Sequence, residues 1–574
     1  MKVNEVPIPG EHKTVQSRIL EYLNEIGWEI ISRENSEEKR GFSSGSEPTI
    51  YHIDTLYEKI LEFNPKYSAN KEEAVRYFSR LKPDIYGNKM HLEYLRNNGK
   101  FFCEDENREL DLILINYNDL SKNKFEVTEE FYFHNGSFGI REDVVLLING
   151  IPIVVIECKN ANKSEAIALG VDQIRRYHDE TPEIFVPEMI FAATEAIGFS
   201  YGVTWNLVRR NIFNWKHQKI GDLELKIKSF CDQEHIVSMI KENIVFAEKD
   251  ERLNKYILRQ HQSTAVEKVV KRCHDNEHLR GLIWHTQGSG KTFTMIKAAE
   301  ILFKSNESRK PTILLMIDRN ELEDQLLKNL SSLGLKNIQH ADNIKRLVEL
   351  LANDYRGIIV STIQKFRGMP VSISTRENIY ILIDEAHRTT GGDLGNFLVG
   401  GLPNATLIGF TGTPIDKTAY GKGTFKIFGK DDPKGYLDKY SIQESIEDGT
   451  TLPLYYNIAP NEMLANRELM EKEFWANAKA DGITDIAELN KILDRAINLK
   501  NFIKGSSRIK KISKYIANHY RENIEPLGYK AFLVAVDREA CAMYKKALDE
   551  FLPPEYSQVV YTGNNSDSKS LKEH

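Results

Sequence analysis

The sequence has few cysteines, and none of them form a paired motif. Five occur in 574 residues, with no CxxC spacing. They are Cys103, Cys158, Cys231, Cys273 and Cys541. This usage argues against a disulfide framework and against a cysteine-rich zinc site, and it fits a reducing, cytoplasmic compartment.

Long apolar segments are also missing. The longest apolar stretch, residues 144–158, is interrupted by Asn149, Gly150 and Pro152. A membrane-spanning helix needs about 20 consecutive apolar residues, so we expect no membrane association.

The chain has no large excess of charge of either sign. Lys and Arg total 77 and Asp and Glu total 83, for a net charge of −6. Any contact with nucleic acid must therefore come from local basic surface. Hydrophobic residues make up 41% of the chain, which argues against a mainly disordered protein. At about 150 residues per domain, the length predicts three or four domains.

Apolar runs typical of β-strands alternate with helical segments in the second half of the chain. These runs cover residues 282–284, 313–317, 358–360, 379–383 and 406–410. The alternation predicts an α/β fold with a doubly wound parallel sheet.

The first part of the chain predicts a mixed α/β unit that closes near residue 240. Residues 15–31 have helical apolar spacing, and the polar residues 32–46 predict a loop. Strands are predicted at residues 110–117, 125–133, 144–148 and 153–158. Asn149-Gly150 between the last two is a strong hairpin signal.

A phosphate-binding loop is predicted where the strand at residues 282–284 ends. The following segment, residues 285–292, reads HTQGSGKT, and it departs from the usual pattern because His285 stands at the first glycine position. Main-chain N–H groups of such a loop can bind phosphates, with Lys291 reaching the β and γ oxygens and Thr292 a magnesium ion. The remaining predicted contacts come from Gly288, Ser289 and Gly290.

Two carboxylates follow another apolar strand. Asp384 and Glu385 come directly after residues 379–383, at the strand end where ligands of parallel sheets bind. Asp384 suits the magnesium ion of bound ATP, and Glu385 suits a base that orients the attacking water.

Five motifs in order resemble those of superfamily 2 helicases over residues 255–415. They are Gln262, Gly290-Lys291-Thr292, Asp318-Arg319, Asp384-Glu385-Ala386-His387 and Thr411-Gly412-Thr413-Pro414. The resemblance implies that Gln262 reads the adenine and that Asp318-Arg319 lies near the DNA backbone. It also implies that Thr411 and Thr413 couple the nucleotide state to DNA contact.

A second carboxylate site is predicted around the hairpin. Asp143 opens one strand, and Glu157 and Lys159 alternate with Cys158 on the other, so they share a face. Two carboxylates can hold a divalent cation, and a nearby lysine can position or activate water for attack on phosphate. A salt-bridged strand end is the structural alternative.

Gln173 and Tyr177 lie four residues apart on the next predicted helix and share a face. Together with Asp143, Glu157 and Lys159 they resemble the PD-(D/E)xK nuclease fold with a QxxxY element. Glu142 stands where the family's motif often has proline. A helical glutamate often completes such sites; Glu58 is a candidate, with a solvated helix face as its alternative.

An N-terminal nuclease joined to this motor resembles the restriction (R) subunit of type I restriction-modification enzymes. The resemblance implies a type I site-specific deoxyribonuclease that translocates duplex DNA with ATP and cuts it with Mg²⁺. It also implies docking to methyltransferase (M) and specificity (S) subunits. The predicted domains are a nuclease at 1–245, a first RecA-like domain at 246–460, and a helical connector with an incomplete second RecA-like domain at 461–574.

The C-terminal part leaves alternatives open. Residues 495–521 are strongly basic, which suits either contact with the DNA backbone or a solvated helix. Residues 530–536 and 559–563 resemble the start of the second RecA-like domain, and the family's later motifs do not follow. We therefore expect this chain alone to bind nucleotide weakly and not to translocate. A stand-alone repair helicase-nuclease and a non-translocating DNA-binding remnant are the other hypotheses.

Overall fold

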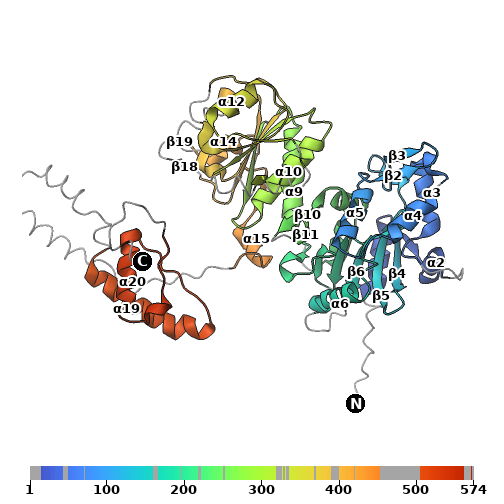
Figure 1. Cartoon of the computed structure of the whole chain (residues 1–574), viewed down its shortest axis with the longest axis horizontal. Coiled ribbons are helices and arrows are strands. Elements are labelled where there is room, and N and C mark those ends of the chain that lie inside the picture. The colour runs from blue at the N-terminus through green and yellow to red at the C-terminus, as the bar shows by residue number, and fades with distance from the viewer. Residues whose placement is uncertain are drawn as a thin grey trace, which may run out of the picture. The chain divides into compact units, whose positions relative to one another are not determined.

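The computed structural model is a mixed α/β protein that forms two compact units, Met1–Pro453 and Leu454–His574 (Figure 1). None of the helices that it describes combines the length and apolar character needed to cross a bilayer. The described residues are 15–42, 49–69, 71–159, 166–195, 197–216, 222–249, 252–318, 326–327, 330, 335, 337–366, 370–389, 400–415, 417–418, 421–452, 504–561 and 571.

A seven-stranded mixed sheet organises the first part of unit 1, in the order β1-β4-β5-β6-β7-β8-β9. β1 pairs with β4 in parallel, as β6 does with β7, and the other pairs are antiparallel. The strands are β1 (Glu29–Ile31), β4 (Phe125–His134), β5 (Gly139–Ile148), β6 (Ile151–Cys158), β7 (Ile190–Thr194), β8 (Phe199–Val203) and β9 (Phe213–Asn214).

The predicted hairpin is confirmed. Asn149 and Gly150 have φ angles of 54° and 80°, and two consecutive residues with positive φ make the turn that fits the twist of paired strands. A side chain at Gly150 would have no room, because its Cβ would lie 2.5 Å from the carbonyl oxygen of His52. The turn therefore fixes the register of β5 against β6.

Helices cover both faces of this sheet. One face packs its even-numbered β5 residues, such as Val144 and Leu146, against α1 (Ser17–Glu25), α3 (Ile53–Phe63), α4 (Lys71–Ser79) and α5 (Ile85–Leu95). The other face packs Val145 and Leu147 against α6 (Ala166–Glu180). Alternate residues of β5 thus pack into two different hydrophobic cores, one on each face of the sheet.

Two predicted elements near the start of the chain were wrong in extent. The helix predicted over 15–31 ends at Glu25, since Gly27 has a φ of 93° and β1 follows. The loop predicted over 32–46 contains α2 (Arg33–Lys39), whose first turn is capped by the Ser32 hydroxyl.

The strand predicted over 110–117 is short. β3 (Arg108–Asp111) pairs with β2 (Lys100–Cys103), and the chain then leaves the ladder. The main-chain N–H groups of Ile113 and Leu114 donate instead to the side-chain oxygens of Asn64 and Asn97. Side-chain acceptors from distant helices therefore replace a partner strand here.

A short connecting region joins the two parts of unit 1. It contains α7 (Leu223–Phe230), α8 (Gln233–Ser238), β10 (Ile244–Lys249) and β11 (Arg252–Ile257). Lys255 is fully buried, and its ammonium donates to the Met189 carbonyl and the Thr204 hydroxyl at 2.9 Å each. The boundary predicted between residues 245 and 246 falls within β10.

The second sheet of unit 1 is parallel throughout its seven strands. Its order is β14 (Ile338–His340), β15 (Gly357–Thr362), β13 (Thr312–Ile317), β16 (Ile379–Ile383), β17 (Thr406–Thr411), β12 (Arg280–His285) and β20 (Asp438–Tyr440). All five predicted strands are confirmed, while β14 and β20 were not predicted. In Figure 1, α9 (Gln260–Cys273), α10 (Lys291–Lys304) and α12 (Ile344–Ala352) lie around this sheet.

Unit 2 contains α19 (Ser506–His519) and α20 (Arg538–Leu548), which pack together through small apolar clusters. The strand predicted over 530–536 is wrong: no paired strand forms there, and Phe532 and Val534 are 98% and 91% exposed. An apolar run forms a strand only when a neighbouring strand binds its main chain, and none of the described residues does so. Residues 562–563 lie outside the described part.

Candidate nuclease and nucleotide sites

The sheet brings the three residues of the predicted nuclease motif together. Lys159 Nζ lies 3.1 Å from Glu157 Oε2, 3.5 Å from Asp143 Oδ2 and 3.2 Å from the carbonyl oxygen of Cys158. Asp143 Oδ2 also accepts a hydrogen bond of 2.7 Å from the Cys158 N–H. Pairing of β5 with β6 therefore gathers three oxygens around one ammonium group.

Burial dominates the electrostatics of these carboxyl groups. Glu157 is fully buried, and its Oε1 has no hydrogen-bond partner among the described residues. Burial raises the pKa of Glu157 well above its ordinary value, and the nearby Asp143 charge adds to the rise. Burial also raises the pKa of Asp143, although Lys159 opposes the change. The single ammonium group of Lys159 therefore does not offset the effect of burial on the pKa of these two carboxyl groups.

A divalent cation fits this donor set. Mg²⁺ prefers oxygen ligands and is usually held by one or two carboxylates while it keeps several waters. Asp143 and Glu157 supply two carboxylates, and the unpartnered Glu157 Oε1 is an available donor atom. Within the described residues, no three Asp, Glu, His or Cys side chains converge as ligands, so remaining ligands would be main-chain or water oxygens.

The predicted QxxxY pair lies beside this site on α6. Gln173 Nε2 donates to the Tyr177 hydroxyl at 2.6 Å, and that hydroxyl donates to the carbonyl oxygen of Arg141 at 2.7 Å. Tyr177 therefore ties α6 to β5 two residues before Asp143. A Cβ at Gly170 would lie 3.0 Å from the Cβ of Ala193, so the glycine lets α6 pack closely against β7.

Glu58 does not join the site. It is exposed on α3, whose buried residues Leu56 and Ile60 pack on the face of the sheet opposite to α6. The helical glutamate proposed from the sequence is therefore not at this position.

The predicted phosphate-binding loop ends at the first turn of α10. Gly288 and Gly290 have φ angles of 80° and 84°, which favour glycine. The Ser289 hydroxyl donates to the Thr286 carbonyl at 2.7 Å, and Lys291 Nζ donates to the same oxygen at 3.3 Å. Burial lowers the pKa of Lys291, and Glu385 and Asp384 oppose that shift. The loop thus presents a buried amine at a helix N-terminus, where phosphate binds readily.

The two acidic residues after β16 face this loop. Asp384 Oδ2 accepts a hydrogen bond of 3.3 Å from the Thr292 hydroxyl. Burial and then the neighbouring Glu385 charge raise the pKa of Asp384. Glu385 has a φ of 47°, a strained conformation for a residue with a side chain, and such strain is common at functional sites. Asp384, which we predicted for the magnesium ion, therefore contacts the predicted magnesium-binding Thr292.

The predicted motif on β17 contacts the same acidic turn. His387 Nδ1 lies 2.9 Å from the Thr411 hydroxyl and 3.4 Å from Glu385 Oε2. A Cβ at Gly412 would lie 3.0 Å from the main-chain nitrogen of Gln287 in the phosphate-binding loop. Because β17 lies between β12 and β16, it brings Thr411 between the two halves of the nucleotide site.

Gln262 contacts the phosphate-binding loop itself. Its Oε1 accepts from the Arg259 N–H at 2.9 Å, and its Nε2 donates to the carbonyl oxygen of Gly290 at 3.2 Å. A Cβ at Gly290 would lie 2.5 Å from this nitrogen. Gln262 thus caps α9 and supports the loop, and its predicted contact with adenine stays a prediction.

The sequence analysis missed the residues that support His285. This side chain is buried, and its Nε2 lies 2.7 Å from Asp438 Oδ2 on β20. Asp438 also accepts from Lys268 at 2.5 Å, and Tyr440 stacks on His261 at a centroid distance of 3.7 Å. β20 has only three residues, so no periodic signal identified it.

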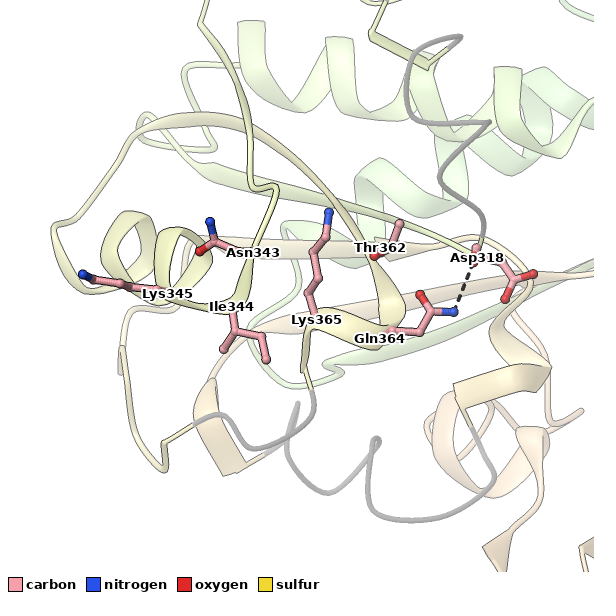
Figure 2. Close-up of a pocket in the computed structure, with 7 residues that line it drawn as sticks. All are labelled: Asp318, Asn343, Ile344, Lys345, Thr362, Gln364 and Lys365. Atoms are coloured by element: carbon pink, nitrogen blue, oxygen red, sulfur yellow. Dashed lines mark hydrogen bonds between the residues drawn. The ribbon is translucent and has the colours of Figure 1, made fainter. Parts of the chain in front are cut away.

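A pocket of about 750 Å³ lies at the carboxyl ends of β13 and β15. Gln364 Nε2 donates to the Asp318 carbonyl at 3.1 Å at one end, and Lys345 and Asn343 lie at the other (Figure 2). The lining residues are Asp318, Asn343, Ile344, Lys345, Thr362, Gln364 and Lys365. Arg319 lies outside the described residues.

Part of the predicted basic stretch is engaged within unit 2. Lys504 pairs with Asp537 and Glu539 at 3.2 and 2.6 Å, and Lys510 pairs with Glu550 at 2.6 Å. Residues 495–503 lie outside the described part. These pairs reduce the positive charge that α19 could offer to a partner.

Two regions of the chain match known families. Residues 9–204 match the family described as type I restriction enzyme R protein N terminus. Residues 261–485 match the SWI2/SNF2 ATPase family. The first match contains the carboxylate site, and the second contains the phosphate-binding loop and the acidic turn.

Curated relatives match across both regions. The chain is 31% identical to a putative type I restriction enzyme MjaVIIIP endonuclease subunit of Methanocaldococcus jannaschii, over 100% of this chain and 59% of that protein. It is 26% identical to the type I restriction enzyme HindI endonuclease subunit of Haemophilus influenzae, over 98% of this chain and 57% of that protein. The chain therefore spans a little over half the length of these relatives.

Among solved structures, the ATP-dependent Type ISP restriction-modification enzyme LlaBIII bound to DNA is 17% identical, with a TM-score of 0.30. The match covers 53% of this chain and 22% of that one, and its TM-score is too low to support a comparison of the two sites.

The raised pKa of Glu157 predicts how its substitution affects stability. Above pH 4.5 the unfolded chain ionises this group while the folded protein resists ionisation, so the group costs more stability as pH rises. Glu157→Gln removes this cost. In the presence of a chelator, we expect it to raise the midpoint of thermal unfolding more at pH 8 than at pH 5.

The exposed Glu58→Gln variant is the control and should give the same small change at both pH values. Equal effects of Glu157→Gln at pH 5 and pH 8 would contradict the burial of an ionisable carboxyl group at this position.

Proposed function

This chain belongs to the family of type I restriction enzyme R subunits, and we propose that it couples ATP-dependent translocation of duplex DNA to Mg²⁺-dependent cleavage. The proposal rests on one observation above all: two carboxylates, a lysine and a main-chain carbonyl converge at the end of β6. The match to R-protein sequences supports this assignment, and the adjoining ATPase region supplies the motor.

In the nuclease reaction, Asp143 and Glu157 would hold Mg²⁺, which supplies Lewis-acid stabilisation of charge on the phosphate. Lys159 lies within 3.5 Å of both carboxylates, so its ammonium can orient water and stabilise negative charge beside them. Tyr177, anchored on the Arg141 carbonyl, keeps α6 and Gln173 against the site. Each residue therefore has a position that suits hydrolysis of a phosphodiester.

In the motor, ATP would bind at the loop of Gly288, Ser289 and Gly290. Lys291 would contact the β and γ phosphates, and Thr292 with Asp384 would hold the magnesium ion that accompanies ATP. The Thr292 hydroxyl already lies 3.3 Å from Asp384. Glu385 would orient the attacking water, and its contact with His387 leads to Thr411.

DNA would contact the motor at the pocket of Figure 2. This pocket offers two lysines, Lys345 and Lys365, together with amide and hydroxyl groups from Asn343, Thr362 and Gln364. Such groups suit the phosphate backbone of DNA, which is bound mainly by charge and by uncharged hydrogen-bond donors. The pocket lies on the carboxyl side of the sheet, as the nucleotide site does.

Methyltransferase and specificity subunits are the proposed protein partners. The curated relatives are subunits of type I restriction enzymes by name, and the choice of DNA sequence would then belong to another chain. Co-purification with these subunits separates this function from that of a stand-alone repair helicase-nuclease.

Lys159→Ala tests the nuclease proposal. In a complex reconstituted with the methyltransferase and specificity subunits, we expect DNA cleavage to fall at least about 100-fold, because charge stabilisation at the phosphate is lost. ATP hydrolysis should stay at the wild-type rate. The exposed Lys122→Ala variant of the same domain is the control. Cleavage near the wild-type rate in Lys159→Ala would show that the site is misassigned.

Lys291→Ala tests the motor. Without the ammonium group at the β and γ phosphates, we expect DNA-stimulated ATP hydrolysis to fall at least about 100-fold. Cleavage that depends on translocation should fall with it. Lys304→Ala, at the other end of α10, should keep both activities. Full ATPase activity in Lys291→Ala would refute the nucleotide-site assignment.

A further inference from the structure

Glu130 occupies an unusual position opposite the nuclease site. In the β4–β5 ladder, Glu129 pairs with Val144 and Phe131 pairs with Glu142. This register places Glu130 across from Asp143. Glu130 also has a φ of 53°, in the left-handed region that residues with side chains rarely adopt.

This arrangement is energetically unfavourable by itself. A left-handed backbone conformation is strained for a residue with a side chain, and like charges directly opposite each other destabilise a pair of strands. The conformation also changes the packing of β4. Phe125 and Val127 lie in one hydrophobic core, whereas Phe131 and Phe133, which keep the same sequence parity, lie in the other.

A buried amide holds the Glu130 carboxylate beside Asp143. Gln16 is 3% exposed. Its Nε2 donates to the Asp143 carbonyl at 2.6 Å and to Glu130 Oε1 at 3.3 Å. Arg141 lies 3.4 Å from the other Glu130 oxygen, and the Glu130 side chain is 29% exposed. Gln16 thus links one Glu130 oxygen to the main chain of Asp143, and Arg141 contacts the other oxygen.

Next to Glu130 the site holds two more carboxylates, Asp143 and Glu157, with the ammonium group of Lys159 within 3.5 Å of both. Glu157 is fully buried, and its Oε1 has no hydrogen-bond partner among the described residues. A hard cation would relieve the repulsion among all three carboxylates and would satisfy the unpartnered oxygen.

Glu130 does not form a set of three converging ligands with Asp143 and Glu157. No three acidic, histidine or cysteine side chains converge closely enough for that in the described residues. Mg²⁺ held by two carboxylates keeps several waters, however, and these waters need hydrogen-bond acceptors.

We propose that Glu130 is a third acidic residue of the nuclease site, which binds the divalent cation from outside its direct ligands by accepting hydrogen bonds from the waters that the ion keeps. The inference rests on the proposed nuclease function. It assigns Glu130 as a positioning residue and Gln16 as the group that holds it.

Binding of Mn²⁺ to the full chain without nucleotide tests this role, measured by electron paramagnetic resonance and calorimetry. Glu130→Asn removes the charge, while asparagine tolerates the left-handed conformation. We expect Mn²⁺ affinity to fall roughly tenfold and the midpoint of thermal unfolding to hold or rise. Glu130→Gln, which keeps the side-chain length, should weaken Mn²⁺ to a similar degree.

Glu129→Gln is the matched control, because Glu129 pairs with Val144 on the face away from α6 and should keep wild-type affinity. Wild-type Mn²⁺ affinity in both Glu130 variants would overturn the inference, as would a loss of affinity that only follows a loss of stability. Asp143→Asn separates the two proposals: if it also leaves Mn²⁺ binding unchanged, the nuclease site itself is wrong.

Discussion

Repulsion between the carboxylates of Asp143 and Glu157 is the constraint on which the proposed nuclease site depends. Asp143 and Glu157 are held together by main-chain pairing of β5 with β6, and a single ammonium group lies between them. Burial raises the pKa of both acids. The fold thus disfavours the ionised forms of Asp143 and Glu157, and a bound cation would favour them instead. Sites prepared in this way trade stability for function.

In the second sheet, parallel strand order brings the residues of the candidate nucleotide site together. The phosphate-binding loop, the acidic turn and Thr411 come from sequence segments far apart, yet β12, β17 and β16 are neighbours and end at the same edge. Contacts at this edge are direct, from Thr292 to Asp384 and from His387 to Thr411. A change at the proposed γ-phosphate position can therefore reach Thr411 through few groups.

The sequence predicted what short-range pattern determines, and it failed where distant segments decide. The five central strands of the motor, the Asn149-Gly150 turn and the proximity of Asp143, Glu157 and Lys159 follow from periodicity and spacing. The hydrogen bond between His285 and Asp438 joins residues more than 150 positions apart and depends on a three-residue strand. Glu130 carried no motif, since its significance arises from the register opposite Asp143 and from its backbone angle.

The nuclease proposal requires that the oxygens around Lys159 form a divalent-cation site. A crystal structure of the full chain grown with Mn²⁺, with anomalous scattering measured at the manganese edge, would reveal an ion at this position. We expect an anomalous peak bound by carboxylate oxygens of Asp143 and Glu157, with the Lys159 ammonium displaced from between them. An empty site at saturating Mn²⁺, with Lys159 still contacting both carboxylates, would contradict it and would favour a salt-bridged strand end.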